Sequence, residues 1–364
     1  MRGFRFLCWF IVLAVVALRV APAAVQAQFS SPEGVTVPNT NWIEVVADPA
    51  FRPVRIAPPE GLLELQGAAA TFTVNYLAAG LYYGTRCASW PEQAKLAFDY
   101  AARIWGSLLS SPVPIVVDAC WATNLEPWVL GFGGTNDLQA NFRNAPQINT
   151  WYPVALANAL YGSDLSPNRS DIYVALNSGI PWYFGIDGNT PQQNYDFATV
   201  VLHELAHGLG FLGTMWYGPD CGGENHGCWG YYGYPDSYDR FIQNGGRIPL
   251  LNTAVFPNPS ALLGTELTSN NLYFNGSSAR AANGGNPVKI YAPRIWQPGS
   301  SYAHLDYDTF KDTPHRLMVY AISAGASVHH PGSVTLGILR DLGWGLVSLD
   351  LPLKVYLPLI TSRR

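Results

Sequence analysis

The sequence predicts an α+β fold in which a twisted mixed sheet and a central helix are followed by an irregular C-terminal subdomain. Strand-like and helix-like apolar periods occupy residues 67–212, whereas about ninety residues from 213 onward are rich in Gly, Pro, Asn and Tyr. With 48% hydrophobic and only 13% charged residues, the 364-residue chain can bury a sizeable core. A net charge of −4 without a basic block argues against nucleic-acid binding.

The first 27 residues predict a signal peptide. Arg2 and Arg5 precede an apolar run of 13 residues over 6–18, and Val25-Gln26-Ala27 fits a small-residue cleavage site. Such a run is short for a membrane span, and no later segment reaches about eighteen apolar residues. We therefore expect a secreted, extracellular protein, without a transmembrane helix after cleavage and monomeric; an uncleaved N-terminal anchor is the alternative.

The cysteine count agrees with export, because removal of the leader leaves four cysteines, an even number. Four cysteines allow three pairings, and proximity in sequence favours Cys87 with Cys120 and Cys221 with Cys228. A zinc site of four thiolates is the alternative. It is disfavoured because the spacings contain no two-residue ligand turns.

The chain order of the predicted elements begins with a Pro-rich, extended N-terminal arm over 28–66. In the upper subdomain, 67–212, alternation predicts a strand over 72–76, and helical spacing predicts a helix over 91–109 after a Ser89 cap. Further strands are expected over 113–117 and 171–176, and an apolar helix over 196–209.

The lower subdomain, 213–345, is expected to consist of loops and short strands braced by a disulfide. Regularity returns near its end, where Ser333 and Gly343 frame a helix over 334–342. The C-terminal tail, 346–364, alternates like a strand but contains two prolines.

The segment that carries chemistry is His203-Glu204-Leu-Ala-His207 in the predicted helix. Residues 203 and 207 are one turn apart, so both imidazoles can reach one ion while Glu204 beside them handles a proton. Two neutral imidazoles and a third ligand suit zinc and leave a position for water. The alternative is a buried helix whose histidines only satisfy hydrogen bonds. That helix would carry three polar side chains among apolar ones, and each would cost roughly several kcal/mol if it were left unpaired.

Several residues can supply the third ligand. Glu224 or His226 would serve from the small cysteine loop, although nearby glycines break the helix that a glutamate ligand needs. His315 lies close before Met318. His329 and His330 precede a proline and are more typical of a surface or cleft wall. The remaining histidine is His304.

The residues resemble the leishmanolysin-type branch of the metzincin metallopeptidases. The resemblance is carried by HELAHGLGF at 203–211, SYAHLD at 301–306 and RLM at 316–318. The compact metzincin spacing fails, because position 213 is glycine. The resemblance implies a metzincin-like catalytic domain over 67–345. It assigns the zinc ligands His203, His207 and His304, the general base Glu204, the Met-turn residue Met318 and the helix-ending turn Gly210.

Two features depart from that branch. Tyr320 stands two residues after Met318, where the branch has proline; this is similar to the astacin and serralysin turn, in which the phenol approaches the metal or the developing oxyanion. A buried aromatic is the alternative reading of Tyr320. The arm, 28–66, contains no cysteine, so latency by a thiolate on zinc is unsupported.

We therefore expect a zinc metalloendopeptidase with one catalytic Zn²⁺, in which zinc-bound hydroxide attacks a peptide bond and Glu204 acts as general base. The substrate is expected to be a protein or peptide that adds to an edge strand, for which 171–176 is the candidate. The alternatives are an exported binding or wall-associated module with a structural metal site, and a zinc hydrolase acting on a non-peptide substrate.

Two smaller hypotheses concern acidic residues. Asp220, Glu224, Asp236 and Asp239 lie in a Gly-rich stretch and are candidates for a structural Ca²⁺ site, although they lack EF-hand spacing. Asp306, two residues after His304, is a candidate for orienting an imidazole, with an exposed turn aspartate as the alternative.

Overall fold

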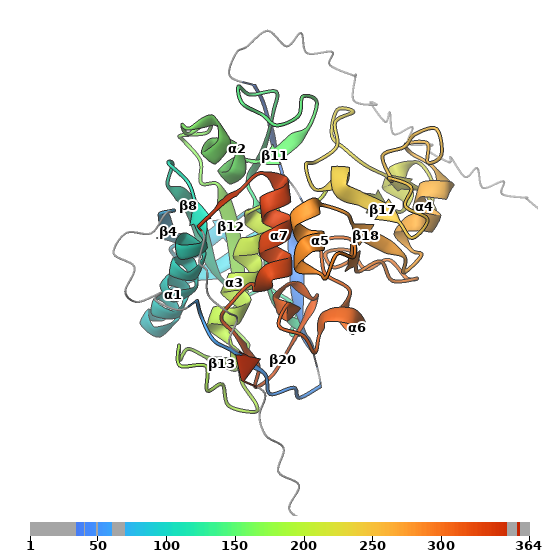
Figure 1. Ribbon diagram of the computed structural model, residues 1–364. Helices are drawn as coiled ribbons and strands as arrows, with labels where there is room; N and C mark the ends of the chain where they lie inside the picture. The colour runs from blue at the N-terminus through green and yellow to red at the C-terminus, as the bar shows by residue number, and fades with distance from the viewer. Residues whose placement is uncertain (1–33, 40, 49, 60–69, 348–354, 357–364) are drawn as a thin grey trace, which may run out of the picture. The chain divides into compact units, whose positions relative to one another are not determined.

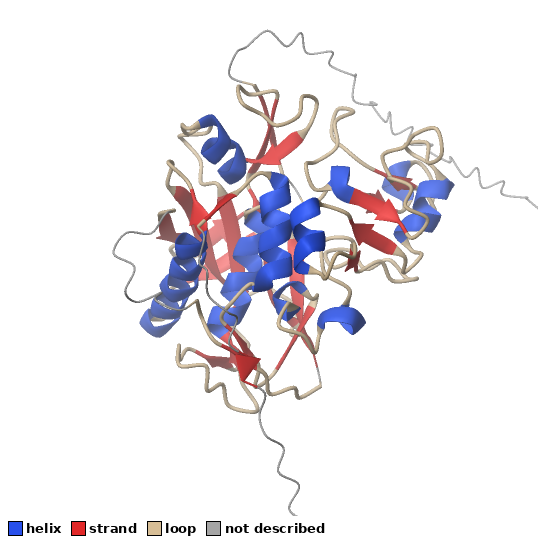
Figure 2. Cartoon of the chain, in the orientation of Figure 1, coloured by secondary structure: helices blue, strands red, loops and turns tan. Residues whose placement is uncertain are grey.

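The computed structural model describes residues 34–39, 41–48, 50–59, 70–347 and 355–356. The predicted signal peptide and most of the C-terminal tail lie outside these residues. The described chain combines helices with a large mixed sheet, as an α+β fold requires (Figures 1 and 2). Among the described residues, no helix has both the length and the apolar character needed to cross a membrane.

The main sheet has eight strands, in the order β20-β2-β9-β12-β8-β6-β5, with β4 also paired to β8. Its strands are β2 (Ile43–Asp48), β4 (Phe72–Tyr76), β5 (Gly80–Tyr82), β6 (Thr85–Ala88), β8 (Ile115–Ala122), β9 (Val129–Thr135), β12 (Ile172–Asn177) and β20 (Ala321–Ser323). The sheet is mixed because β12 runs parallel to β8 and antiparallel to β9.

The prediction that 171–176 forms an edge strand is wrong. This segment is β12, which pairs with a strand on each side and is buried along its whole length. A short, continuously apolar strand is typical of a sheet centre, where both faces are covered. On one side of β12 the sheet continues with β9 and then with β2, which comes from the N-terminal arm.

Helices α1 (Glu92–Leu108) and α3 (Phe197–Gly208) pack together on one face of this sheet (Figure 1). The indole N–H of Trp105 on α1 donates to the carbonyl of Leu202 on α3 over 2.9 Å. α1 begins after Pro91 without a side-chain cap, so Ser89 is not its cap as predicted. The two helices share the main apolar core with β8, β9 and β12.

The start of α3 and its close contact with the sheet both follow from the sequence. Asp196 is the N-cap and accepts from the Thr199 N–H over 3.2 Å. β9 crosses the helix at Glu204 so closely that a Cβ at Gly133 would lie 2.6 Å from the Glu204 carbonyl oxygen. Glycine in β9 therefore permits the contact that places α3 against the sheet.

Residues 213–345, the predicted lower subdomain, contain the expected short elements. They are β15 (Trp216–Tyr217), β16 (Gly227–Cys228), β17 (Ile242–Asn244), β18 (Leu272–Phe274), β19 (Val288–Ile290), α4 (Ala261–Leu267), α5 (Ser277–Ala282), α6 (Tyr307–Phe310), η1 (Pro219–Cys221), η2 (Asp239–Phe241) and η3 (Arg316–Met318). β17, β18 and β19 form an antiparallel sheet of their own. The closing helix α7 (Gly332–Leu342) packs beside α5 and ends at Gly343, while its cap position is Pro331 and not the predicted Ser333 (Figure 1).

The N-terminal arm supplies strands to several sheets. β1 (Val35–Pro38) pairs with β10 (Asp137–Ala140), and β3 (Arg55–Ile56) pairs with β21 (Ser327–Val328) and with β23 (Val355–Tyr356) of the tail. The remaining elements are α2 (Val154–Tyr161), β7 (Leu109–Ser110), β11 (Trp151–Pro153), β13 (Trp182–Tyr183), β14 (Tyr195–Asp196) and β22 (Gly345–Leu346). The arm is thus part of the folded sheet structure over the residues described.

Two disulfides join the pairs that proximity favours. Cys87 on β6 is bonded to Cys120 on β8, within the main sheet. Cys221 at the end of η1 is bonded to Cys228 on β16, and this bond closes the small loop of the lower subdomain.

Candidate metal centre

α3 presents two of the predicted ligands on one face. His203 and His207 are one helical turn apart, and their Nε2 atoms lie 3.0 Å from each other. The third predicted ligand, His304, lies in the loop before α6, and its Nε2 is 3.2 Å from that of His203. These three residues, called the histidine centre below, come together although His304 follows the two helix histidines by about a hundred residues in the sequence.

The proton positions in the histidine centre follow from its hydrogen bonds. The Nδ1 of His203 lies 2.6 Å from the Leu317 carbonyl, that of His207 lies 2.8 Å from the Phe211 carbonyl, and that of His304 lies 2.7 Å from the Ser300 carbonyl. A carbonyl oxygen only accepts, so each Nδ1 carries the proton and each Nε2 carries a lone pair.

Three lone pairs therefore face one another with no proton to share. Such an arrangement is unfavourable unless a cation lies between the nitrogens. Zn–N bonds of about 2.0–2.1 Å with tetrahedral angles place ligand nitrogens about 3.3 Å apart, close to the distances found here. Backbone acceptors on the outer nitrogens are also typical of metal-bound histidines. The donor set fits one zinc ion.

Burial keeps these imidazoles neutral. All three are inaccessible to solvent, and desolvation lowers the pKa of His203 to about 4. Desolvation also lowers the pKa values of His207 and His304 well below the usual range, and the neighbouring imidazoles add to this effect. The neutral form is the one that binds a metal ion.

Glu204 lies beside the histidine centre with an unpaired carboxyl group. The residue has no solvent exposure, and neither carboxyl oxygen has a hydrogen-bond partner of normal geometry among the described residues. Burial and then the nearby Glu44 carboxylate raise the pKa of Glu204, and the Val45 N–H on β2 opposes them only weakly. A buried, unpartnered carboxyl group is costly and marks a functional role.

η3 underlies the centre. Met318 is fully buried, and the Leu317 carbonyl just before it accepts the His203 proton. The Met318 carbonyl in turn accepts from the Leu305 N–H over 2.8 Å, next to His304. η3 therefore connects the helix ligand to the loop ligand through backbone hydrogen bonds.

Tyr320 lies among other tyrosines, and its predicted catalytic role stays a prediction. Its ring stacks on Tyr291 with centroids 4.3 Å apart and lies near Tyr307. Within the described chain, its recorded ring contacts join it to these tyrosines and none joins it to the histidine centre. Its carbonyl accepts from the Val46 N–H on β2.

The other candidate ligands lie elsewhere. Among the described residues, the group of ligands close enough to share an ion contains only the histidine centre, without Glu224, His226, His315, His329 or His330. The prediction of a surface or cleft-wall position is wrong for His329, which is buried and bonds the Asp196 carboxylate over 2.7 Å. His330 accepts from the Gly332 N–H at its Nδ1.

The acidic residues predicted to bind calcium or to orient His304 do not form these sites. Asp236 and Asp239 meet, since the Asp236 N–H donates to Asp239 over 2.9 Å, but the four predicted calcium ligands do not form a group in the described chain. Asp239 explains why position 213 is glycine, because a Cβ there would lie 2.3 Å from its Oδ1. Asp306 caps α6 and does not orient His304, whose proton goes to Ser300.

Sequence reasoning missed the strands above the centre. β2 pairs with β9 and lies over Glu204, where its Val45 N–H acts on the carboxyl group. A cavity of 300 Å³ next to β2 is lined by Trp42, Trp216 and Trp296, but none of the three histidines lines it. Alternating glycines in the segment Gly131-Phe-Gly133-Gly134 were the available signal, since they indicate a close backbone approach.

Comparison with known proteins gives limited similarity. A family described as SPBPB7E8-like matches residues 142–226, which include α3 but neither His304 nor Met318. An uncharacterised protein of Schizosaccharomyces pombe, PB7E8.01, is 33% identical over 96 residues, which is 26% of this chain and 14% of that protein. The chain thus spans a small part of that relative's length. No solved structure matches.

Proposed function

We propose that this chain is an exported zinc-dependent endopeptidase with a metzincin-like catalytic domain. The observation that carries the proposal is the convergence of three Nε2 lone pairs beside the buried, unpaired carboxyl group of Glu204. When bound, a zinc ion would lower the pKa of a coordinated water toward 7 and polarise a carbonyl group.

The chain's own residues have separate parts in this reaction. His203, His207 and His304 would hold the ion through neutral imidazoles, and the carbonyls of Leu317, Phe211 and Ser300 fix the orientation of these imidazoles. Glu204 accepts the proton of the attacking water at its carboxylate and passes it to the leaving amine. A bound cation lowers the pKa of this carboxyl group from its raised value, because it stabilises the charged form.

A structural metal site is the main competing function. Structural zinc is closed by a fourth protein ligand, whereas the ligand group among the described residues has three members. Hydrolysis of a non-peptide substrate is the second alternative. The strand pairing of β9 favours a peptide, since an extended chain adds readily to a strand edge, and here β2 adds to the side of β9 that faces away from β12.

The substitution Glu204→Gln tests the proposal. Zinc-loaded full-length protein is incubated with a reduced, unfolded protein, and new fragments are counted over time by mass spectrometry. Glu204→Gln should bind as much zinc as the unmodified chain and cut at least about 100-fold more slowly, because the base is lost. The matched control is Glu224→Gln, which alters an exposed glutamate in the cysteine loop and should leave cutting unchanged. Measurable cutting by the unmodified chain that Glu204→Gln matches would refute the mechanism.

A further inference from the structure

β2 lies in a groove between the two subdomains. On one side is β9 of the upper subdomain, and on the other are β20 and the loop around Gly299 of the lower subdomain. We propose that this groove is the substrate-binding groove for an extended peptide and that β2 is its intramolecular occupant, which keeps the enzyme latent. The inference rests on the proposed endopeptidase function.

The backbone of β2 is bonded as a bound peptide would be. It runs antiparallel to β9, with Ile43 opposite Gly133 and Val45 opposite Gly131. On its other edge, the Glu44 N–H donates to the Gly299 carbonyl over 2.9 Å and the Val46 N–H donates to the Tyr320 carbonyl over 3.0 Å. Main-chain hydrogen bonds to both walls are the recognition mode of strand addition, which is independent of side-chain identity.

β2 also covers the histidine centre and Glu204. Ile43 packs against Leu212 and Ala303, the residue before His304, while Val45 is fully buried on the strand that contacts α3. With β2 in place, His203, Glu204, His207 and His304 have no solvent exposure. A hydrolytic centre must admit both water and a substrate carbonyl, so β2 has to leave before a peptide can be cut.

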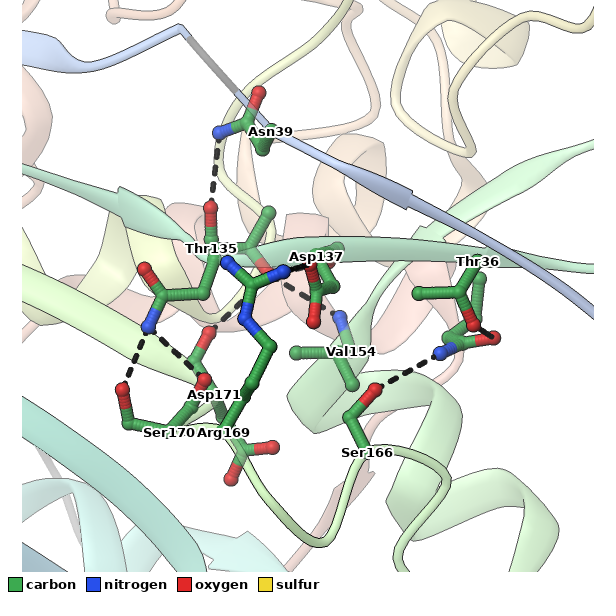
Figure 3. A network of polar contacts seen from close by, with 11 residues as sticks. Thr36, Asn39, Thr135, Asp137, Val154, Ser166, Arg169, Ser170 and Asp171 are labelled. Atoms are coloured by element: carbon green, nitrogen blue, oxygen red, sulfur yellow. Dashed lines mark hydrogen bonds and ion pairs between the residues drawn. The ribbon is translucent and has the colours of Figure 1, made fainter. Parts of the chain in front are cut away.

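Both flanks of β2 are fixed to the domain. Before it, Asn39 donates from its side chain to the Thr135 carbonyl over 2.9 Å, and Thr36 on β1 donates to Gln139 (Figure 3). At its end, Asp48 accepts from the Ser323 hydroxyl over 2.7 Å, and farther along the arm β3 pairs with β21. These anchors raise the effective concentration of β2 at the groove, so a peptide in solution competes poorly.

The device differs from a thiolate on the metal, since the arm has no cysteine. It acts by occupying the peptide position with main chain. A carboxyl group also lies there, because Glu44 has its side chain against Gly299. An incoming peptide would therefore replace the backbone contacts of residues 43–46 in the same antiparallel sense to β9.

Proline substitutions in the full-length chain test the proposal. Val46→Pro removes the N–H that bonds Tyr320, and Glu44→Pro removes the one that bonds Gly299, so each weakens β2 without altering the histidine centre. Thr73→Pro is the matched control, because it alters an exposed residue of β4, a strand of the same sheet that pairs with β8. The readouts are the rate at which dipicolinate removes bound zinc and the rate of cutting of an unfolded protein.

Both rates should rise about tenfold or more in Val46→Pro and Glu44→Pro, while Thr73→Pro behaves as the unmodified chain. Adding Glu204→Gln to Val46→Pro should abolish cutting and leave the faster zinc removal. Unchanged rates in both folded proline variants would overturn the inference and leave the proposed function intact. Faster zinc removal without cutting by any variant would instead refute the proposed function and support β2 as the cover.

If neither proline variant folds, the unmodified chain decides. Amide hydrogen exchange of residues 43–46 reports the opening of β2, and zinc removal by dipicolinate should be no faster than this exchange. Zinc removal that outpaces the exchange of these amides would show that β2 does not cover the centre, and would overturn the inference.

Discussion

Three backbone carbonyls decide what the histidine centre can bind. Because Leu317, Phe211 and Ser300 each accept an Nδ1 proton, the Nε2 atoms present lone pairs toward one point. A core of histidines that only satisfied hydrogen bonds would have given each Nε2 an acceptor or donor of its own. The motif His203-Glu204-x-x-His207 predicts two of these residues, whereas the carbonyl partners depend on the tertiary fold.

Asp171 gives a pH-dependent prediction at the same scale. Its buried carboxylate accepts from the Val116 N–H and the Asn158 side chain, and burial raises its pKa from 3.8 to about 7. The folded state therefore holds this proton more tightly, and the group's contribution to stability falls as pH rises from about 4 to about 7.

Asp171→Asn should remove this pH dependence. The amide loses one of the two hydrogen bonds, at a cost of about 1 kcal/mol. Relative to the unmodified chain, Asp171→Asn should lose most unfolding free energy near pH 4.5. This loss should shrink or reverse by pH 7.5, a change of up to roughly 4 kcal/mol. Urea denaturation of both proteins at several pH values measures the difference. A difference that stays constant with pH would contradict the raised pKa.

At the scale of elements, the contact between β9 and α3 positions Glu204 under the groove. Gly133→Ala would place a Cβ 2.6 Å from the Glu204 carbonyl oxygen, so the strand and helix must separate. We expect a loss of about 1–3 kcal/mol in unfolding free energy, as for overpacked cores, together with weaker zinc binding. Gly179→Ala is the control, because it meets only the Asn177 side chain, at 3.4 Å. Equal melting temperatures for the two variants would contradict the close contact.

The sequence predicts some elements well and others poorly, for physical reasons. Strand 72–76 and the helices containing Trp105 and His203 have clear periods, and they form β4, α1 and α3. β12 is apolar throughout, so its period cannot tell an edge from a centre. The arm contains many prolines, which suggest an irregular segment, yet β2 forms between them. Its partners β9 and β20 are distant in sequence, so the local pattern of the arm does not reveal this pairing.

At the scale of the whole molecule, the histidine centre lies where the two predicted subdomains and the arm meet. α3 belongs to the upper subdomain, His304 and η3 belong to the lower one, and β2 closes the groove between them. Assembly of the ligands therefore requires the complete fold, which explains why third-ligand candidates such as His226 and His315 could not be separated from His304 by spacing alone. Proximity in sequence does predict the disulfides, because each joins neighbouring elements.

Zinc stoichiometry after single ligand substitutions tests the central claim most directly. Protein equilibrated with zinc and freed of unbound metal is analysed by inductively coupled plasma mass spectrometry. The unmodified chain should hold one zinc per molecule, His304→Ala close to none, and His226→Ala and His315→Ala as much as the unmodified chain, because only His304 shares an ion site with α3. Full zinc retention by His304→Ala, or zinc lost equally from all three variants, would contradict the account.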